Sequence, residues 1–188
     1  MKKIKTIRYI AFLRGINVSG QKKILMKDLK NLFEQLGFNG VTTYIQSGNV
    51  VFLSDEKDVS KLIILIEKEI LKQYNIEVSV IIKKIEELIE VLEGNPFKAE
   101  TGNSPDKIYF SLLSEFPSEE NISKIEKLDY KPDIFKIIGK VVYVFCPDGY
   151  GRTKLNNNFF ESKLKVKATT RNLKTLSEMI NLSNSFSQ

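Results

Sequence analysis

The feature that most constrains the fold of this chain is a repeated order of short β-rich segments and amphipathic helical segments. In the first half, β-rich runs occupy 6–13, 41–46, 49–53 and 77–83, and helical periodicity occupies 26–36, 59–70 and 85–92. Apolar residues in the helical segments recur every three or four positions, as Leu29, Leu32 and Leu36 do. This order predicts an antiparallel sheet with helices on one face, which is a ferredoxin-like arrangement.

The same order returns after a polar connector at 95–105 that is broken by proline and glycine. The second set of β-rich runs lies at 107–113, 133–138, 140–145 and 166–170, with helical segments near 118–128, 155–164 and 173–180. We therefore predict an α+β fold with two ferredoxin-like βαββαβ halves, at 1–94 and 106–181, each followed by an extra helix. Residues 182–188 are expected to form a frayed polar tail.

The expected topology also locates the loops. We expect strands one and three of each half to run parallel at the centre of the sheet, so that the loops leaving them emerge at the same edge. The loop at 14–21 in the first half and the loop at 149–158 in the second would then lie at equivalent edges. The hairpin turn Ser47–Gly48 would lie at the edge opposite Arg14.

Composition removes several classes of active site. The chain has no histidine, which excludes Ser-His-Asp and Cys-His nucleophile systems and every histidine-containing metal site. The single cysteine, Cys146, can form neither an internal disulfide nor a cysteine-only zinc site. We expect no resident cofactor, and a Mg²⁺ ion held by carboxylates is the metal site that the composition leaves open.

Length and hydropathy indicate a water-soluble chain. No run of about 18 apolar residues is present, so neither a membrane span nor a membrane partner is expected. The basic N-terminus is not followed by a small-residue cleavage site, which argues against a signal peptide. The unpaired cysteine favours a reducing compartment, and we expect a cytoplasmic location. The sequence leaves the oligomeric state open.

The net charge of +6 is distributed unevenly. Residues 1–40 carry nine Lys or Arg against two acids, and residues 151–188 carry seven against two, whereas 41–150 carry 13 against 19. Two basic ends of this kind point to an anionic partner, either nucleic acid or a phosphorylated small molecule. A lysine-rich surface that only keeps the protein soluble explains the same charges equally well.

The strongest candidate binding loop follows the apolar run at 140–145. Its glycines, Gly149 and Gly151, permit backbone shapes closed to other residues, and Arg152 and Lys154 follow at once. A strand, a glycine loop, basic side chains and a helix N-terminus together suit an anion. The alternative is a structural turn with solvated charges, in which an asparagine such as Asn156 caps the next helix.

Three further residues extend this set of candidates. Arg14 and Asn17 lie in the polar loop after the first strand, where they offer donors for the same ligand, and Arg171 follows the last predicted strand. The alternative is that Asn17 and Ser19 satisfy backbone groups of their own loop. Other motifs favour structural roles: Gln46 and Asn49 flank a hairpin turn, and the aromatic residues of the 140–145 strand are typical of a sheet core.

Five sequence motifs together resemble a known family. They are YIAFLRGINV at 9–18, YIQSGNVVF at 44–52, NPF at 95–97, GRTKLNN at 151–157 and ATTRN at 168–172. In this order they are similar to the bacterial domain-of-unknown-function family 1697, and the similarity extends over roughly residues 6–180. Leu173 departs from the pattern, because relatives often carry tryptophan there. The resemblance implies a small soluble protein with ferredoxin-like subdomains and brings no established activity.

The leading functional expectation is therefore a binding protein for an anionic ligand, held by Arg14, Arg152, Lys154 and Arg171. Two alternatives remain open at this point. One is a small enzyme acting on a nucleotide-like substrate, with no catalytic residue assigned, and the other is a protein-interaction module whose motifs are purely structural.

Overall fold

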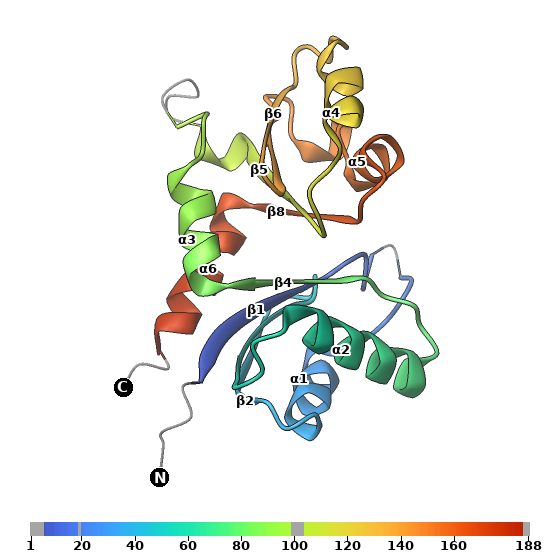
Figure 1. Cartoon of the computed structure of the whole chain (residues 1–188), viewed down its shortest axis with the longest axis vertical. Helices are drawn as coiled ribbons and strands as arrows, with labels where there is room; N and C mark the ends of the chain where they lie inside the picture. The colour runs from blue at the N-terminus through green and yellow to red at the C-terminus, as the bar shows by residue number, and fades with distance from the viewer. Residues whose placement is uncertain (1–5, 19, 99–103, 186–188) are drawn as a thin grey trace. The chain divides into compact units, whose positions relative to one another are not determined.

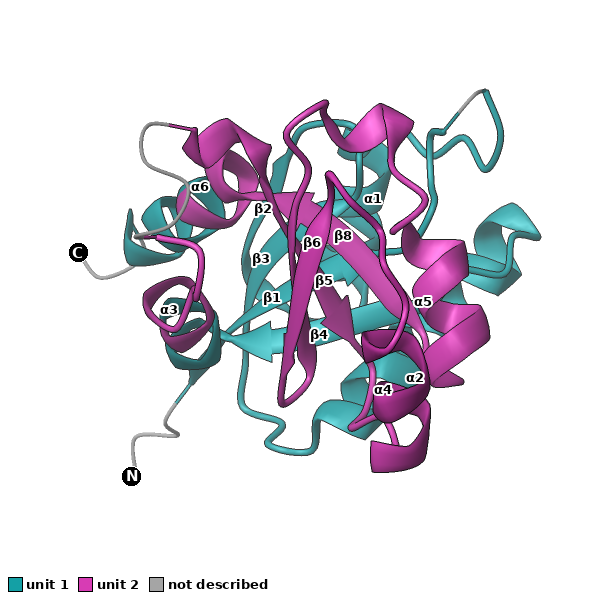
Figure 2. Cartoon of the chain, turned by 90° about the horizontal axis from the view of Figure 1, so that it is seen from above, with its two compact units in different colours: residues 1–89, 178–188 teal, residues 90–177 magenta. Residues whose placement is uncertain are grey.

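The computed structural model describes residues 6–18, 20–98 and 104–185, and it divides into two compact units. Unit 1 comprises residues 1–89 and 178–188, and unit 2 comprises residues 90–177 (Figure 2). The divisions fall within two helices, α3 (Ile85–Glu93) and α6 (Leu173–Asn184). Part of the predicted connector, 99–103, and the last three residues of the predicted tail lie outside the described residues. The start of that tail is helical, because α6 continues to Asn184.

Unit 1 has the predicted order of elements (Figure 1). They are β1 (Ile7–Leu13), α1 (Met26–Gln35), β2 (Asn39–Tyr44), β3 (Asn49–Ser54), α2 (Val59–Tyr74) and β4 (Val80–Lys84). The sheet order is β2-β3-β1-β4, and every pairing is antiparallel. This is the ferredoxin-like arrangement, so the predicted fold class is confirmed for this half.

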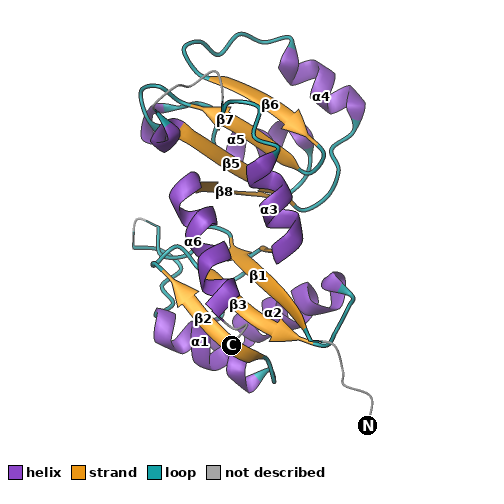
Figure 3. Ribbon diagram, turned by 90° about the vertical axis from the view of Figure 1, so that its left-hand side faces the viewer, coloured by secondary structure: helices purple, strands orange, loops and turns teal. Residues whose placement is uncertain are grey.

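Unit 2 repeats the arrangement. Its elements are β5 (Ile108–Leu113), α4 (Glu119–Glu126), β6 (Ile134–Ile138), β7 (Val141–Phe145), α5 (Asn157–Leu164) and β8 (Ala168–Asn172), with short 3-10 turns at Pro105–Lys107 and Tyr150–Arg152. The sheet order β6-β7-β5-β8 matches that of unit 1, again with antiparallel pairing (Figure 3).

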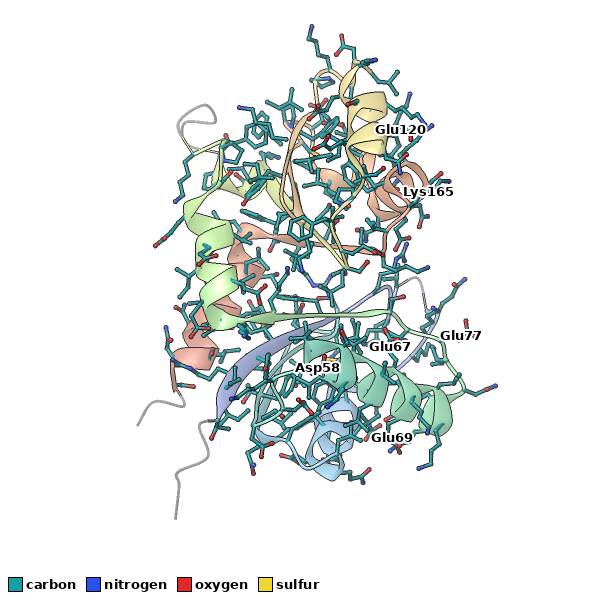
Figure 4. All side chains as sticks on the ribbon, in the orientation of Figure 1. Asp58, Glu67, Glu69, Glu77, Glu120 and Lys165 are labelled. Atoms are coloured by element: carbon teal, nitrogen blue, oxygen red, sulfur yellow. The ribbon has the colours of Figure 1, made fainter. Side chains whose placement is uncertain are left out.

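The helices form where the sequence gives them an apolar stripe and an N-terminal cap. In α2, Leu62, Ile66 and Ile70 are buried at four-residue spacing. Asp58 caps the first turn by accepting from the Ser60 N–H at 2.9 Å, and it lies at the start of the helix in Figure 4. Asn75 ends the helix in the left-handed conformation, with φ of 54°.

Each sheet buries one face beneath its own two helices. In unit 1 this core gathers around an aromatic cluster of Tyr9, Phe33, Phe38 and Phe52, with neighbouring ring centroids 4.6–5.8 Å apart. In unit 2 the corresponding core contains Leu113, Val142, Leu155 and Phe160. Among the described residues, no helix has the length and apolarity that crossing a membrane requires.

Candidate functional site

Apart from Arg171, which lies on β8, the predicted site residues fall into one loop cluster in each unit. In unit 1, the loop that follows β1 contains Arg14 and Asn17, and the Asn17 side chain ties this loop to the β2–β3 turn. Its amide nitrogen donates to the carbonyls of Ile24 at 2.9 Å and Gln46 at 2.8 Å, and its Oδ1 accepts from the Ile24 N–H at 2.9 Å. Both amide protons of Asn17 are therefore used inside the loop cluster.

Gly48 completes this connection on the apolar side. Its φ is +73°, and a Cβ at this position would lie 2.7 Å from Ile16 Cδ1 and 2.8 Å from Leu13 Cβ. Its carbonyl also accepts from the Leu13 N–H at 2.8 Å. Only glycine satisfies both the left-handed backbone and this close approach.

The strand pairings and the contacts of Gly48 show that two predictions about topology were wrong. Strands one and three are antiparallel in both units, so the loops that leave them emerge at opposite edges of each sheet. The 14–21 and 149–158 loops therefore do not occupy equivalent edges. The turn at Gly48 lies beside the Arg14 loop rather than opposite it, because each crossover helix makes strands one and two point the same way.

The same loop cluster concentrates unusual backbone conformations. Among the described non-glycine residues, φ is positive at five positions, and two of these, Asn75 and Lys165, are helix C-caps. The other three, Asn17 at 56°, Lys22 at 47° and Ile45 at 46°, lie in the loop after β1 or in the adjoining turn. For Ile45, which is β-branched, this conformation costs on the order of 1–3 kcal/mol.

Lys22 and Arg14 join this loop to the segment that precedes β4. Lys22 donates from its ammonium group to the Glu77 carbonyl. Arg14 is partly buried, and its backbone N–H donates to the Ser79 carbonyl at 2.9 Å. The cluster is thus built chiefly from internal contacts.

The predicted binding loop of unit 2 is attached firmly to its sheet. Gly149 has φ of +88° and donates its N–H to the Cys146 carbonyl at 3.0 Å. The Tyr150 ring lies 4.7 Å, centroid to centroid, from the Tyr109 ring on β5. Asn156 caps α5 by accepting from the Phe159 N–H at 3.1 Å, as the structural alternative expected.

Thr170 on β8 is the main polar anchor of this loop. Its hydroxyl donates to Asn157 Oδ1 at 2.7 Å and accepts from the Tyr150 hydroxyl at 2.9 Å. Because that donation uses its one proton, the 2.6 Å contact with Ser111 must be a donation from the serine hydroxyl. The Thr170 hydroxyl is therefore saturated, with one bond donated and two accepted.

Ser111, Asn157 and Thr170 were not among the predicted site residues. Ser111 is 0% exposed in the middle of an otherwise apolar strand, and a serine at such a position was the available signal. A buried hydroxyl needs a hydrogen-bond partner, so the sequence pointed to a polar contact over β5. It did not point to the partner, which lies on another strand.

Arg152 and Lys154 differ from the residues of the Thr170 network both in exposure and in hydrogen bonding. Both side chains are exposed, and within residues 104–185 neither forms an ion pair or a hydrogen bond through its charged group. The acid of the same loop, Asp148, is exposed and is not paired with either of them. Two unpaired cations thus project from a loop whose backbone is fixed by Tyr150, Asn156 and Thr170.

Arg171 lies apart from these two cations. Neighbouring residues of a strand point to opposite faces, so Arg171 points away from the loop that Thr170 holds. Its guanidinium is buried and donates to Thr169 Oγ1 at 2.8 Å and to the Thr170 carbonyl at 2.9 Å. Burial lowers the pKa of Arg171 to about 10, so the side chain remains charged at neutral pH.

Cys146 and Tyr143, whose side chains could otherwise react or stack, occupy buried positions. Burial raises the pKa of the Cys146 thiol to about 11, so it is protonated and a poor nucleophile at neutral pH. Tyr143 is 3% exposed and donates to the Val91 carbonyl at 3.1 Å, which removes it as an open platform for stacking a base. No cluster of three or more potential metal ligands occurs among the described residues.

Comparisons with known proteins agree with this architecture. Among solved structures, the chain is similar to the conserved bacterial protein SP0830 from Streptococcus pneumoniae, with 25% sequence identity and a TM-score of 0.73. The alignment covers 95% of this chain and 99% of that one. No curated protein matches. The family model described as "protein of unknown function (DUF1697)" matches residues 7–143, well over half of the chain, and the chain belongs to this family.

Proposed function

We propose that the chain binds a phosphate-bearing ligand through Arg152 and Lys154. The observation that supports this proposal is the exposure of two unpaired cations on a loop fixed by the Thr170 network. Because the loop is held before any ligand arrives, binding orders few additional groups, which lowers its entropic cost. The arginine fork suits two phosphate oxygens at once, and the lysine adds a point charge.

The backbone amides contribute less in this proposal than the sequence predicted. The Gly149 N–H is already bonded to Cys146, so the side chains of Arg152 and Lys154 provide the recognition. Asn156 acts through its cap on α5, and Gly151 has open space around it. Asn17 and Arg171 are held by internal hydrogen bonds and Arg14 belongs to the other unit, so the proposal rests on Arg152 and Lys154 alone. We place this binding in the cytoplasm, on the ground of the unpaired thiol.

The test compares two double variants with the same loss of charge. Arg152→Ala with Lys154→Ala should weaken binding at least tenfold, whereas Lys163→Ala with Lys167→Ala, on exposed positions around the end of α5, should change it less than about threefold. Binding is measured by fluorescence anisotropy with labelled single-stranded DNA and RNA, and by calorimetry with nucleotides and sugar phosphates. Thermal unfolding should be nearly unchanged in both variants.

The salt dependence separates the two sources of phosphate. If the ligand is nucleic acid, the logarithm of the affinity falls linearly with the logarithm of the salt concentration, and the Arg152–Lys154 variant reduces that slope by about 2. A phosphorylated small molecule gives a shallower slope and a defined stoichiometry. Equal loss in both double variants, or no binding of any probe, would refute the proposed site.

A further inference from the structure

The outer edge of the unit 2 sheet carries a second surface, separate from the Arg152 loop. β6 is the end strand in the order β6-β7-β5-β8, and among the described residues it pairs only with β7. Figure 3 shows it as the outermost strand of that sheet. In an antiparallel ladder the hydrogen-bonding groups of an end strand alternate in direction, so about half of those in β6 have no strand partner.

The exposed large apolar side chains of unit 2 gather along this strand. Among its described residues they are four: Phe116 at 71%, Leu128 at 50%, Ile138 at 49% and Ile134 at 38% exposed. Ile134 and Ile138 lie on β6 itself, and Leu128 lines a hollow of about 170 Å³ together with Ile134. Phe116 lies beside the β6–β7 turn, 3.8 Å from the place where a Cβ on Gly139 would stand. Apolar groups collected in this way mark an interaction surface.

Apolar and basic side chains alternate along one face of this strand. Side chains of alternate residues share one face of a strand, so Ile134, Lys136 and Ile138 point the same way. Lys140 follows at the turn, with its ammonium group 5.4 Å from the Phe116 ring centroid. The Lys136 ammonium lies 5.9 Å from the Phe97 ring centroid. The edge thus presents the basic Lys136 between the apolar Ile134 and Ile138, with Lys140 in the turn beyond them.

We propose that β6 accepts an extended acidic segment of another protein as an added strand. Main-chain hydrogen bonds to the open edge would supply affinity, and side chains at every second position would supply specificity. The segment that fits has apolar residues opposite Ile134 and Ile138, a carboxylate opposite Lys136 and a second carboxylate past Ile138, near Lys140, because opposite charges across strands stabilise the pair. Asp129 and Asp133 lie at the Ile134 end, which confines the carboxylates of the partner to the turn end.

A second copy of this chain fits the edge less well. Antiparallel pairing of β6 with itself, in the register that sets Ile134 against Ile138, places Lys136 opposite its own counterpart. Like charges directly opposite each other destabilise a strand pair, and a lysine within an open edge is a known device against self-pairing. Charge complementarity therefore favours the acidic segment.

The probe is a fluorescein-labelled peptide with two repeats of valine, threonine, glutamate and threonine, and its control has lysine in place of glutamate. At about 50 mM salt we expect a dissociation constant on the order of 10–100 µM for the glutamate peptide and at least tenfold weaker binding of the lysine peptide. Hydrogen exchange at the amides of Phe135 and Ile137 should slow when the glutamate peptide is added.

The matched variants are Lys136→Glu and Lys124→Glu, the latter on the exposed face of α4 in the same unit. The first should weaken peptide binding at least tenfold, and the second less than twofold. Lys140→Glu is the second edge variant, should Lys136→Glu fail to fold. The variant Arg152→Ala with Lys154→Ala should bind the peptide normally, which separates this proposal from the phosphate site.

Three outcomes would overturn the proposal. They are no saturable binding up to about 1 mM peptide, equal binding of the glutamate and lysine peptides, and normal binding by both edge variants. Sedimentation equilibrium adds a fourth, because a dimer that tightens when Lys136 is replaced by threonine would show that a second copy occupies the edge.

Discussion

Replacement of Thr170 by valine tests whether the polar network fixes the loop of unit 2. Valine keeps the shape of threonine but removes the hydroxyl that bonds Ser111, Tyr150 and Asn157. Each such bond contributes about 0.5–1.5 kcal/mol net, and a partner left buried without a bond costs about 1–3 kcal/mol. Ser111 is 0% exposed and bears the full penalty, whereas Tyr150 and Asn157 are partly exposed to water. We expect Thr170→Val to destabilise the chain by about 2–4 kcal/mol.

The assay is urea and thermal unfolding of the full chain, followed by circular dichroism. At about 2–4 °C per kcal/mol for a chain of this size, the midpoint should fall by roughly 4–16 °C. Thr170→Ser is the matched control, because it keeps the hydroxyl and loses one methyl group, at about 1 kcal/mol. In a Ser111→Ala background the effect of Thr170→Val should shrink by about 1 kcal/mol, since one of its partners is already gone. A loss below about 0.5 kcal/mol, or equal losses for valine and serine, would refute the anchoring role.

Two further predictions concern packing and pH. Gly48→Ala should destabilise the chain by more than about 2 kcal/mol, because the added Cβ collides with Ile16. Gly15→Ala is the control, because Gly15 has a similar φ of +69° but open space around it, and it should cost only about 1 kcal/mol in unfolding experiments. Because burial raises the pKa of Cys146 from an ordinary value near 9 to about 11, the folded state retains a proton that the unfolded state releases in this range. Stability should therefore fall as pH rises from about 9 to about 11, and Cys146→Ala should flatten the decline by roughly 2 kcal/mol in unfolding measured across that window. Parallel pH profiles for wild type and variant would contradict this.

The sequence predicted the elements well because their patterns are local. Local residue patterns marked every strand and α-helix of both halves, and the glycine and proline positions marked the breaks. Strand ends were predicted less well, and one of them has a clear cause. The second strand was predicted to reach Gln46, but it ends at Tyr44 because Ile45 adopts a left-handed backbone. Isoleucine favours strands, so its own identity concealed this turn.

The site was harder to predict because its contacts join distant elements. Thr170 gathers partners from β5, the 3-10 turn at Tyr150 and α5, and no local spacing reports such a meeting. Asn17 joins two loops 29 residues apart. The direction of the third strand was nevertheless within reach of the sequence, since one helical crossover followed by a hairpin requires strands one and three to be antiparallel.

The Cys146 thiol reports local unfolding of the unit 2 core. It is the chain's single cysteine, and it is 0% exposed in the core of unit 2. A thiol reagent can reach it only when that core opens, so the labelling rate under native conditions measures the opening free energy of one unit alone. If that free energy equals the value for global unfolding, the two units melt as one cooperative body. If it is smaller, unit 2 opens while unit 1 stays folded.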